Sequence, residues 1–383
     1  MAESIYLMQA DGVRLEIDLS TGSVWSLTIE RDGREVTPLH RPPWIDEPDI
    51  AGDASLPLHV RRLSGDFFFS PFGKSDLEAA PLHGWSANWS WSHIGSQAHP
   101  SGGVSARFEL DRPILGARLV KEITLRDFHP FVYQRHIFEG GSGAVPVASH
   151  AMTRFAGGGR LFFSPKAYGE TLEVALEPDP SRGRSALRYP SRFADLGAAP
   201  LANGGHADLQ SYPFASRHED FVMLVEAARS RLGWAAALRE NERDVFLSLK
   251  NPADFPVTFL WFSNGGRDYR PWNGRHFGVL GIEEGRSWSA RGHRASSEPN
   301  AMSREGIPSA LQLGAGEAAE VRHVIGGIPL GSGWSDIQSI TAAEGALVIN
   351  AGSAEMLQLP FDSEFLATRR QAVASTGNGM GLV

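Results

Sequence analysis

The residues best suited to acid–base chemistry lie in one stretch of the chain, residues 261–287. This stretch ends in two adjacent carboxylates, Glu283 and Glu284. A carboxylate can take a proton from a hydroxyl group, and arginines bind polar or anionic groups through several N–H donors. Before the glutamates comes a loop of side chains suited to a polar ligand: Arg267, Asp268, Tyr269, Arg270, Trp272, Asn273, Arg275 and His276. The stretch therefore predicts a site for a polar ligand.

The two glutamates follow an apolar strand predicted at residues 277–282. Adjacent residues of a strand point to opposite faces, so the two carboxylates cannot act as a pair. If Phe277, Val279 and Gly281 share a face, Glu283 lies on it, and Glu284 is structural or exposed on the other. An acid on a packed face is costly unless it has partners or a function. The alternative for Glu283 is a strand-end carboxylate in solvent.

Two histidines upstream add groups that exchange protons near neutral pH, since the unperturbed pKa of histidine is ~6.5. His83 lies in a Leu-His-Gly-Trp motif that leads to Asn88, and His150 lies in the middle of a predicted strand. His150 could instead be a core histidine bonded to a backbone carbonyl, and His83 could cap a turn before Gly84. The tryptophans at 85, 89 and 91 are typical of sheet packing, although we expect at least one to line a cleft.

The elements that must position these residues are strands. Residues 13–19 alternate strictly between apolar and polar, as in a half-buried strand. Residues 335–346 are the one stretch that suggests a short helix, and no repeat of fixed period appears. We predict one all-β domain over residues 1–383, a large antiparallel β-sandwich, with a surface excursion at 178–205 and a peripheral tail from about 335. Further strands are predicted at 24–29, 104–110, 117–125, 131–138, 145–155, 161–164, 221–225, 232–238, 244–249, 257–262, 321–325, 346–349 and 356–359.

Composition excludes several classes of function. The net charge is −8 over 383 residues, which argues against a nucleic-acid or anionic-membrane partner. There is no cysteine, which excludes disulfides and zinc–thiolate sites. His83, His93 and His99 are too widely spaced, without a carboxylate partner, for a metal site, so we expect no metal and no cofactor. We find no signal peptide and no apolar run approaching ~18 residues, which predicts a cytoplasmic protein.

Three short motifs follow one another along the chain: Leu82-His83-Gly84, then His150 in a predicted strand, then Ile282-Glu283 after a loop rich in glycine and aromatic residues. This order, with Gly65–Gly73 before the first motif, resembles the aldose 1-epimerase (galactose mutarotase-like) superfamily over residues 13–325. The resemblance implies a supersandwich whose concave face binds a monosaccharide or sugar derivative. It further implies that Glu283 takes the proton of the anomeric hydroxyl, that His150 protonates the ring oxygen, and that His83 binds the sugar.

The sequence departs from that family in two places, which fits a divergent subgroup. The family usually carries an arginine ahead of the His-Gly motif, where residues 70–74 offer only Lys74. His150 is followed by Ala151-Met152 where the family has x-Tyr-Phe. An arginine cluster in the pocket would suit an acidic or phosphorylated sugar. Besides the catalytic pair, the predicted sugar-binding residues are His83, Trp85, Asn88, Lys74, Arg267, Asp268 and Arg275.

Two other functions stay open. One is a carbohydrate-binding protein without turnover on the same fold, favoured by the missing arginine. The other is a glycoside hydrolase or lyase, which needs a second acid beside Glu283, with Asp66 and Asp268 as candidates. A homodimer is possible in each case.

Overall fold

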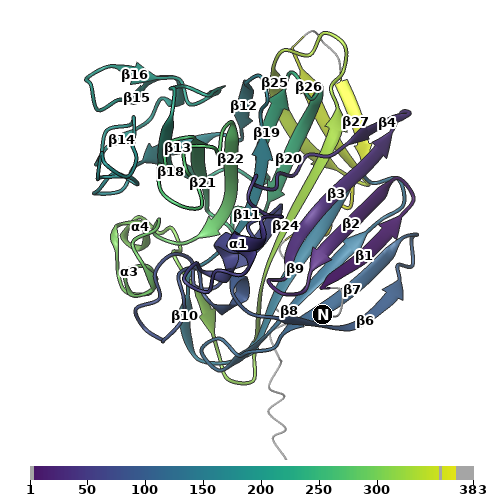
Figure 1. The fold of residues 1–383 in the computed structure, drawn as a ribbon. Helices are drawn as coiled ribbons and strands as arrows, with labels where there is room; N and C mark the ends of the chain where they lie inside the picture. Colours follow the sequence, from purple (N-terminus) through teal and green to yellow (C-terminus); the bar gives the residue numbers. More distant parts are fainter. Residues whose placement is uncertain (1–3, 353–355, 368–383) are drawn as a thin grey trace, which may run out of the picture.

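The computed structural model describes residues 4–352 and 356–367, and it consists of stacked antiparallel sheets (Figure 1). The first sheet has eleven strands. Ten follow one another across it, and β4 (Arg34–Val36) pairs with β3. The order is β1 (Ile5–Ala10), β2 (Val13–Asp18), β3 (Ser23–Arg31), β5 (Asp66–Phe69), β11 (Val147–Arg154), β22 (Val279–Arg286), β21 (Val257–Asn264), β18 (His218–Glu226), β13 (Lys166–Glu170) and β14 (Arg192–Phe193).

The second sheet has nine strands and packs against the first. Its order is β17 (Ser211–Tyr212), β12 (Gly159–Phe163), β19 (Gly233–Arg239), β20 (Asp244–Lys250), β24 (Ala318–Pro329), β9 (Phe131–Gly140), β8 (Ala117–Leu125), β7 (Val104–Leu110) and β6 (Trp91–Ala98). The predicted large antiparallel β-sandwich is therefore confirmed.

Helices are few and short among the described residues. They are α1 (Pro48–Ala51), α2 (Leu58–Arg61), α3 (His293–Ser297) and α4 (Ala301–Arg304), with 3₁₀ turns η1 (Trp85–Ala87) and η2 (Leu196–Ala198). Two small ribbons pair β10 (Gly143–Val145) with β23 (Leu311–Leu313) and β15 (Ala199–Pro200) with β16 (His206–Ala207). Within the described part of the chain, no helix is long and apolar enough to cross a membrane.

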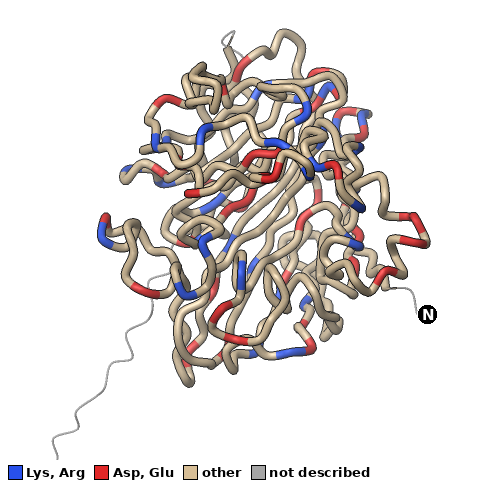
Figure 2. Tube along the Cα trace, turned by 60° about the vertical axis from the view of Figure 1, so that its left-hand side comes forward, with Lys and Arg blue, Asp and Glu red and all other residues tan. Residues whose placement is uncertain are grey.

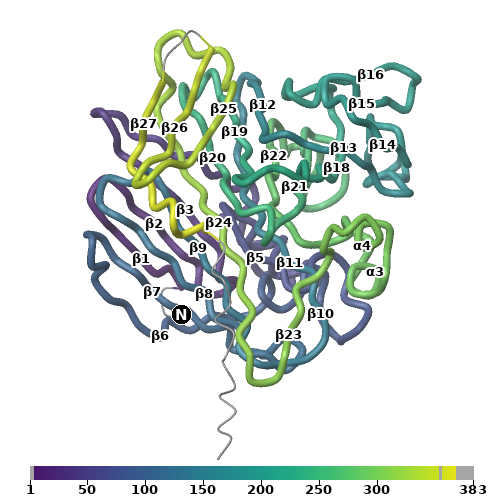
Figure 3. The backbone as a smooth tube through the Cα atoms, turned by 180° about the vertical axis from the view of Figure 1, so that it is seen from behind, coloured from purple at the N-terminus to yellow at the C-terminus, as the bar shows by residue number. Residues whose placement is uncertain are grey.

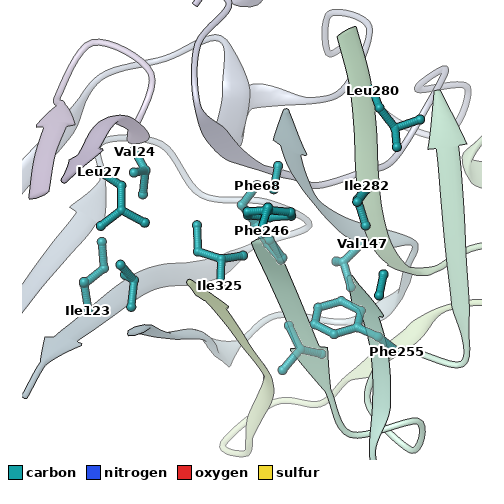
Figure 4. Close-up of a cluster of buried hydrophobic side chains, with 14 of the residues drawn as sticks. Val24, Leu27, Phe68, Ile123, Val147, Phe246, Phe255, Leu280, Ile282 and Ile325 are labelled. Atoms are coloured by element: carbon teal, nitrogen blue, oxygen red, sulfur yellow. The ribbon is translucent and has the colours of Figure 1, made fainter. Parts of the chain in front are cut away.

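The main core lies between the two large sheets (Figure 4). Phe68 and Ile282 of the first sheet meet Phe246 and Ile325 of the second there, all nearly inaccessible to solvent. Since strand neighbours alternate, Phe67 and Phe69 point to the opposite, outer face of the first sheet. That outer face has its own apolar cluster, which the segment around α1 and α2 helps to cover (Figure 1).

The prediction of a short helix at residues 335–346 is wrong. The segment forms β25 (Ile337–Ala343), which joins β26 (Ala346–Ala351) and β27 (Met356–Pro360) in a three-stranded sheet. Ile337 and Ile340 are buried because they pack on the outer face of the second large sheet. Their burial therefore does not require a helix. Figure 3 shows β25–β27 lying over β19 and β20.

The excursion at residues 178–205 is more than a surface loop. It projects beside β13 and β18 and carries β14 and β15 (Figure 1). Leu187 and Ala199 nevertheless reach the main core and are buried there. Charged residues of both signs are interspersed along the chain, as Figure 2 shows.

Candidate active site

A cavity of about 430 Å³ lies on the outer face of the first sheet. Strands β5, β11, β21 and β22 form its floor, and α2 with the loops at 72–83 and 267–272 form its walls. The structure brings three of the predicted residues together here, since His83, His150 and Glu283 all line this cavity.

A larger cavity of about 890 Å³ lies elsewhere, lined by Arg135, Glu320 and Arg322 among others. Among the residues that the structure describes, neither a histidine nor an aromatic residue lines it. Both Arg135 and Arg322 are bonded to Glu320. The larger cavity is lined by carboxylates, whereas the smaller one sets a histidine against a carboxylate between aromatic walls, and we therefore take the smaller cavity as the candidate site.

Strand alternation delivers the central pair. Glu283 follows Ile282 on β22, and Ile282 points into the main core, so Glu283 points into the cavity. His150 of the neighbouring strand β11 meets it, with His150 Nε2 and Glu283 Oε1 3.1 Å apart. Both side chains are buried, at 7% and 3% exposure. The predicted phase of this strand is thus the observed one.

Gly281 makes room for this pair. A Cβ at residue 281 would lie 3.1 Å from His150 Cε1 and 3.3 Å from Glu283 Oε1. Both distances are tighter than ordinary van der Waals contact. A larger side chain at 281 would therefore push the histidine and the carboxylate apart.

Aromatic rings hold the two predicted histidines in place. Phe67 stacks on His150 with ring centroids 4.7 Å apart, and Phe69 stacks on His83 at 4.0 Å. Trp261 closes on His150 from another side, at 5.4 Å. Such walls exclude water, strengthen the polar contacts inside, and offer flat faces for the C–H surfaces of a sugar.

His83 is held by an unusual turn. Its φ is +68°, in the left-handed region where histidine is one of the less disfavoured residues. Gly84 follows at +75°, and a Cβ there would lie 1.9 Å from Ser70 O. The Gly73 backbone N–H points at His83 Nδ1 over 3.4 Å. Burial lowers the pKa of His83 well below its ordinary value, and His59, His150 and Arg267 lower it further. The ring is therefore neutral at neutral pH.

His59 is a site residue that the sequence analysis missed. It lies on α2, lines the cavity, and meets His83 edge to face with ring centroids 5.2 Å apart. Burial is the main reason that its pKa falls to about 4. The only signal in the sequence is a histidine between the apolar residues Leu58 and Val60, a pattern equally typical of a core histidine.

Asn88 supports the site without lining the cavity. Its Oδ1 accepts from His59 N at 3.1 Å and bonds His59 Nδ1 at 2.9 Å. Its Nδ2 donates to Leu82 O and Gly84 O, at 3.0 and 2.8 Å. Asn88 thus ties α2 to the turn that carries His83.

Arg267 lines the cavity but is not a free charge. Its Nε donates to Glu177 Oε1 at 2.6 Å, and its Nη1 lies 3.5 Å from Glu219 Oε1. The guanidinium also lies over the ring of Trp272, 4.7 Å from the centroid. The two carboxylates are far away in sequence, so nothing in the loop itself indicated them.

The structure does not bring three other predicted residues to the cavity. Trp85 packs beneath the guanidinium of Arg112, 3.9 Å from its ring centroid, on the side of the main core. Asp268 binds Arg217 at 3.0 Å and also Arg184, and Arg275 binds Glu47. The loop at 267–275 curls tightly, with Gly274 N bonded to Arg267 O, so these last two side chains point away.

Besides Arg267, Lys74 and Arg270 lie at the cavity. Lys74 lines it and is exposed. Arg270 lines it too, but is paired with Asp49 and Asp53. Lys74 has no charged partner among the described residues, which leaves it as the cation most available to a ligand.

Neither candidate for the second acid of a hydrolase, Asp66 or Asp268, lines the cavity. Asp66 points into the main core, where Gln134 Nε2 donates to it at 2.6 Å and His323 Nε2 lies 3.2 Å away. Its other oxygen accepts the His150 backbone N–H at 3.1 Å. Asp268 is bonded at the surface. Among the described residues, Glu283 is the only carboxylate that lines the cavity.

Glu219 gives the site a pH-dependent support. It accepts from Trp261 Nε1 at 2.5 Å and from Ser263 Oγ at 3.1 Å. Burial raises its pKa to about 7, although Arg267 and the two donors act in the opposite direction. In the unfolded chain the same group titrates near 4.5. The folded state therefore holds this proton more tightly than the unfolded state.

We expect Glu219→Gln to flatten the dependence of unfolding free energy on pH. A raised folded-state pKa contributes stability that is complete below about pH 4.5 and is lost as pH rises through about 7. Glutamine does not ionise, so the unfolding free energy of the variant should fall by up to about 3 kcal/mol less than that of wild type as pH rises. Urea unfolding between pH 4.5 and 8 measures it. The exposed Glu298→Gln is the control, and parallel curves for wild type and Glu219→Gln would contradict the expectation.

Comparisons with known proteins address the fold. No family model matches the sequence, and no curated protein matches it. A candidate aldose 1-epimerase from Escherichia coli K12 is similar in structure, with TM-score 0.55, 13% identity, and 85% of this chain and 99% of that chain covered. A candidate aldose 1-epimerase from Klebsiella pneumoniae has TM-score 0.54 and 14% identity, with 82% of this chain and 77% of that chain covered. A protein of Synechocystis sp. PCC 6803 has TM-score 0.52 and 11% identity, with 85% of this chain and 96% of that chain covered.

Such identities speak for the fold alone. The chain has the aldose 1-epimerase, or galactose mutarotase-like, fold over most of its length, as the order of the motifs predicted.

Proposed function

We propose that this protein is a sugar 1-epimerase-like isomerase that interconverts the anomers of an aldose. The observation that carries the proposal is the contact of His150 Nε2 with Glu283 Oε1, 3.1 Å apart at the floor of an aromatic-walled cavity. Anomer exchange needs a base at the anomeric hydroxyl and an acid at the ring oxygen. Because both oxygens are bonded to the same carbon, an acid and a base side by side can serve them.

The steps balance without an outside reagent. Glu283 takes the proton of the anomeric hydroxyl while His150 gives a proton to the ring oxygen, and the bond from C1 to the ring oxygen breaks. The open aldehyde turns about the C1–C2 bond. When the ring closes, the hydroxyl oxygen that becomes the ring oxygen again returns its proton to His150, and the carbonyl oxygen takes a proton from Glu283. Both side chains then have the protonation states with which they started.

The surroundings support a neutral aldose rather than an acidic or phosphorylated one. Arg267, Arg270 and Arg275, which suggested an anionic ligand in the sequence, are each paired with carboxylates of this chain. A second negative group would have to displace those partners. Lys74 at the rim is the remaining attraction for an anion.

A second candidate is a protein that binds a sugar without turning it over. The observation in its favour is the absence of an arginine from residues 70–74, where the resembling family usually has one. Phe69 and Phe72, in and next to this segment, line the cavity. The two candidates share the ligand and differ only in the fate of its anomeric carbon.

Exchange NMR on freshly dissolved aldoses, with neutral, acidic and phosphorylated sugars in the panel, separates the candidates. We expect the protein to speed the approach of a neutral aldose to its anomeric equilibrium, and polarimetry gives the same rate independently. Binding without acceleration would leave the binding protein standing. If no sugar binds, both proposals fail.

A further inference from the structure

Two neutral histidines, His59 and His83, stand side by side in the cavity and are not needed for proton transfer in the proposed reaction. Their rings are nearly perpendicular, at 85°, with centroids 5.2 Å apart. Both line the cavity together with His150 and Glu283. The protein contacts around each ring fix which of its nitrogens carries the proton.

The tautomer of His59 follows from Asn88. The amide nitrogen of Asn88 faces two backbone carbonyls, of Leu82 and Gly84, so the amide cannot be reversed without losing both bonds. Asn88 Oδ1 must then face His59 Nδ1, at 2.9 Å. An amide oxygen only accepts, so His59 Nδ1 carries the proton and Nε2 is left with a lone pair.

The tautomer of His83 is the reverse. Its Nδ1 faces the backbone N–H of Gly73 at 3.4 Å, and a backbone N–H only donates. In the neutral ring the proton is therefore on Nε2. Neither Nε2 has a hydrogen-bond partner among the described residues, so one histidine can offer the cavity an acceptor and the other a donor.

We propose that His59 and His83 form a recognition pair of opposite polarity for two adjacent hydroxyl groups of the sugar. One hydroxyl donates to His59 Nε2, and its neighbour accepts from His83 Nε2–H. The inference rests on the proposed sugar ligand but not on turnover. It assigns a binding role to His59 and makes the pair selective for a vicinal diol, because a group that only accepts cannot satisfy His59.

The tautomers can be tested without any ligand. Long-range ¹H–¹⁵N correlation spectra distinguish a protonated from an unprotonated ring nitrogen, and the variants His59→Asn and His83→Asn identify the two rings among the 13 histidines. We expect the unprotonated nitrogen to be Nε2 in His59 and Nδ1 in His83. The opposite tautomer in either ring overturns the proposal.

The same variants test recognition. Asparagine can keep the contact made by Nδ1, with Asn88 or with Gly73 N–H, and it tolerates the positive φ of residue 83. It removes only the group at Nε2. Calorimetric titration of deoxy and deoxyfluoro sugars supplies the readout, because fluorine accepts weakly and never donates.

We expect one ring position at which fluorine weakens binding as much as hydrogen does, by roughly two- to tenfold, and a neighbour at which fluorine costs less. His59→Asn should abolish the effect at the first position only, and His83→Asn at the second only. Equal losses at every position, or no change in folded variants, would overturn the pair. Turnover without this pattern refutes the pair alone, whereas the pattern without turnover refutes the isomerase alone. If no sugar binds, both fail.

Discussion

Glu283→Gln should abolish catalysis of anomer exchange while the sugar still binds. Glutamine keeps the shape of the side chain and can hold a hydrogen bond to His150, but it cannot accept the anomeric proton. General-base catalysis is typically worth about 10²–10⁴-fold, which corresponds to about 3–5 kcal/mol of activation barrier. Exchange NMR gives the rate and calorimetry the affinity for the same aldose.

His150→Asn is the companion change. It should cost a similar factor, because ring opening needs a proton at the ring oxygen, and an asparagine amide can donate a hydrogen bond but cannot transfer its proton. If both variants keep wild-type rates, the protons move through other groups and the assignment of the pair is wrong. If Glu283→Gln loses affinity in proportion to rate, the carboxylate serves binding rather than chemistry.

Glu284→Gln should lower stability and leave the chemistry intact. On the core side of β22, Glu284 Oε2 lies 2.6 Å from Lys250 Nζ, and its oxygens accept from Ser248 and Thr258 at 2.8 Å each. Lys250 also lies 3.0 Å from Glu226, which in turn binds Lys166. The substitution leaves two buried lysines with one carboxylate. Breaking such a buried pair costs about 3–5 kcal/mol, and we expect the lower end because Glu226 remains.

Urea unfolding measures this loss. Glu298→Gln, at an exposed pair with Arg294, is the matched control and should change stability by less than about 0.5 kcal/mol. Below the unfolding transition, anomer exchange by Glu284→Gln should equal the wild-type rate. A variant as stable as wild type but unable to bind sugar would show that Glu284, rather than Glu283, faces the cavity.

Much of the sheet could be predicted from the sequence, because buried strands leave a pattern. The strands at 104–110 and 117–125 have the predicted bounds, and the apolar phase of β22 assigned its two glutamates to opposite faces. The edge strand β6 (Trp91–Ala98) was missed, since seven of its eight residues are exposed and it carries no apolar alternation. The helix predicted at residues 335–346 is wrong because so short and polar a segment carries too little periodicity to distinguish a helix from a strand.

For the site, alternation along β22 indicated Glu283, and the order of the short motifs indicated His83 and His150. Lys74 and Arg267 of the loops also line the cavity, whereas other loop side chains are directed away from it by partners that lie far away in sequence. Asp268 and Arg275 turn toward Arg217 and Glu47 for this reason. His59 is positioned in the site by its hydrogen bond to Asn88, 29 residues further along the chain. No local pattern in the sequence distinguishes it from a core histidine.

The three-stranded sheet β25–β27 makes the last described part of the chain hard to dispense with. It covers apolar side chains of the second large sheet: Phe131, Trp234, Leu247, Leu249 and Val324. A chain cut before Trp334 would keep both large sheets and every residue of the proposed site, yet it would present this patch to water. We expect such a truncated protein to aggregate on expression, since exposed apolar patches of that kind associate. Shortening this protein from its C-terminal end would thus fail through insolubility, not through damage to the sugar cavity.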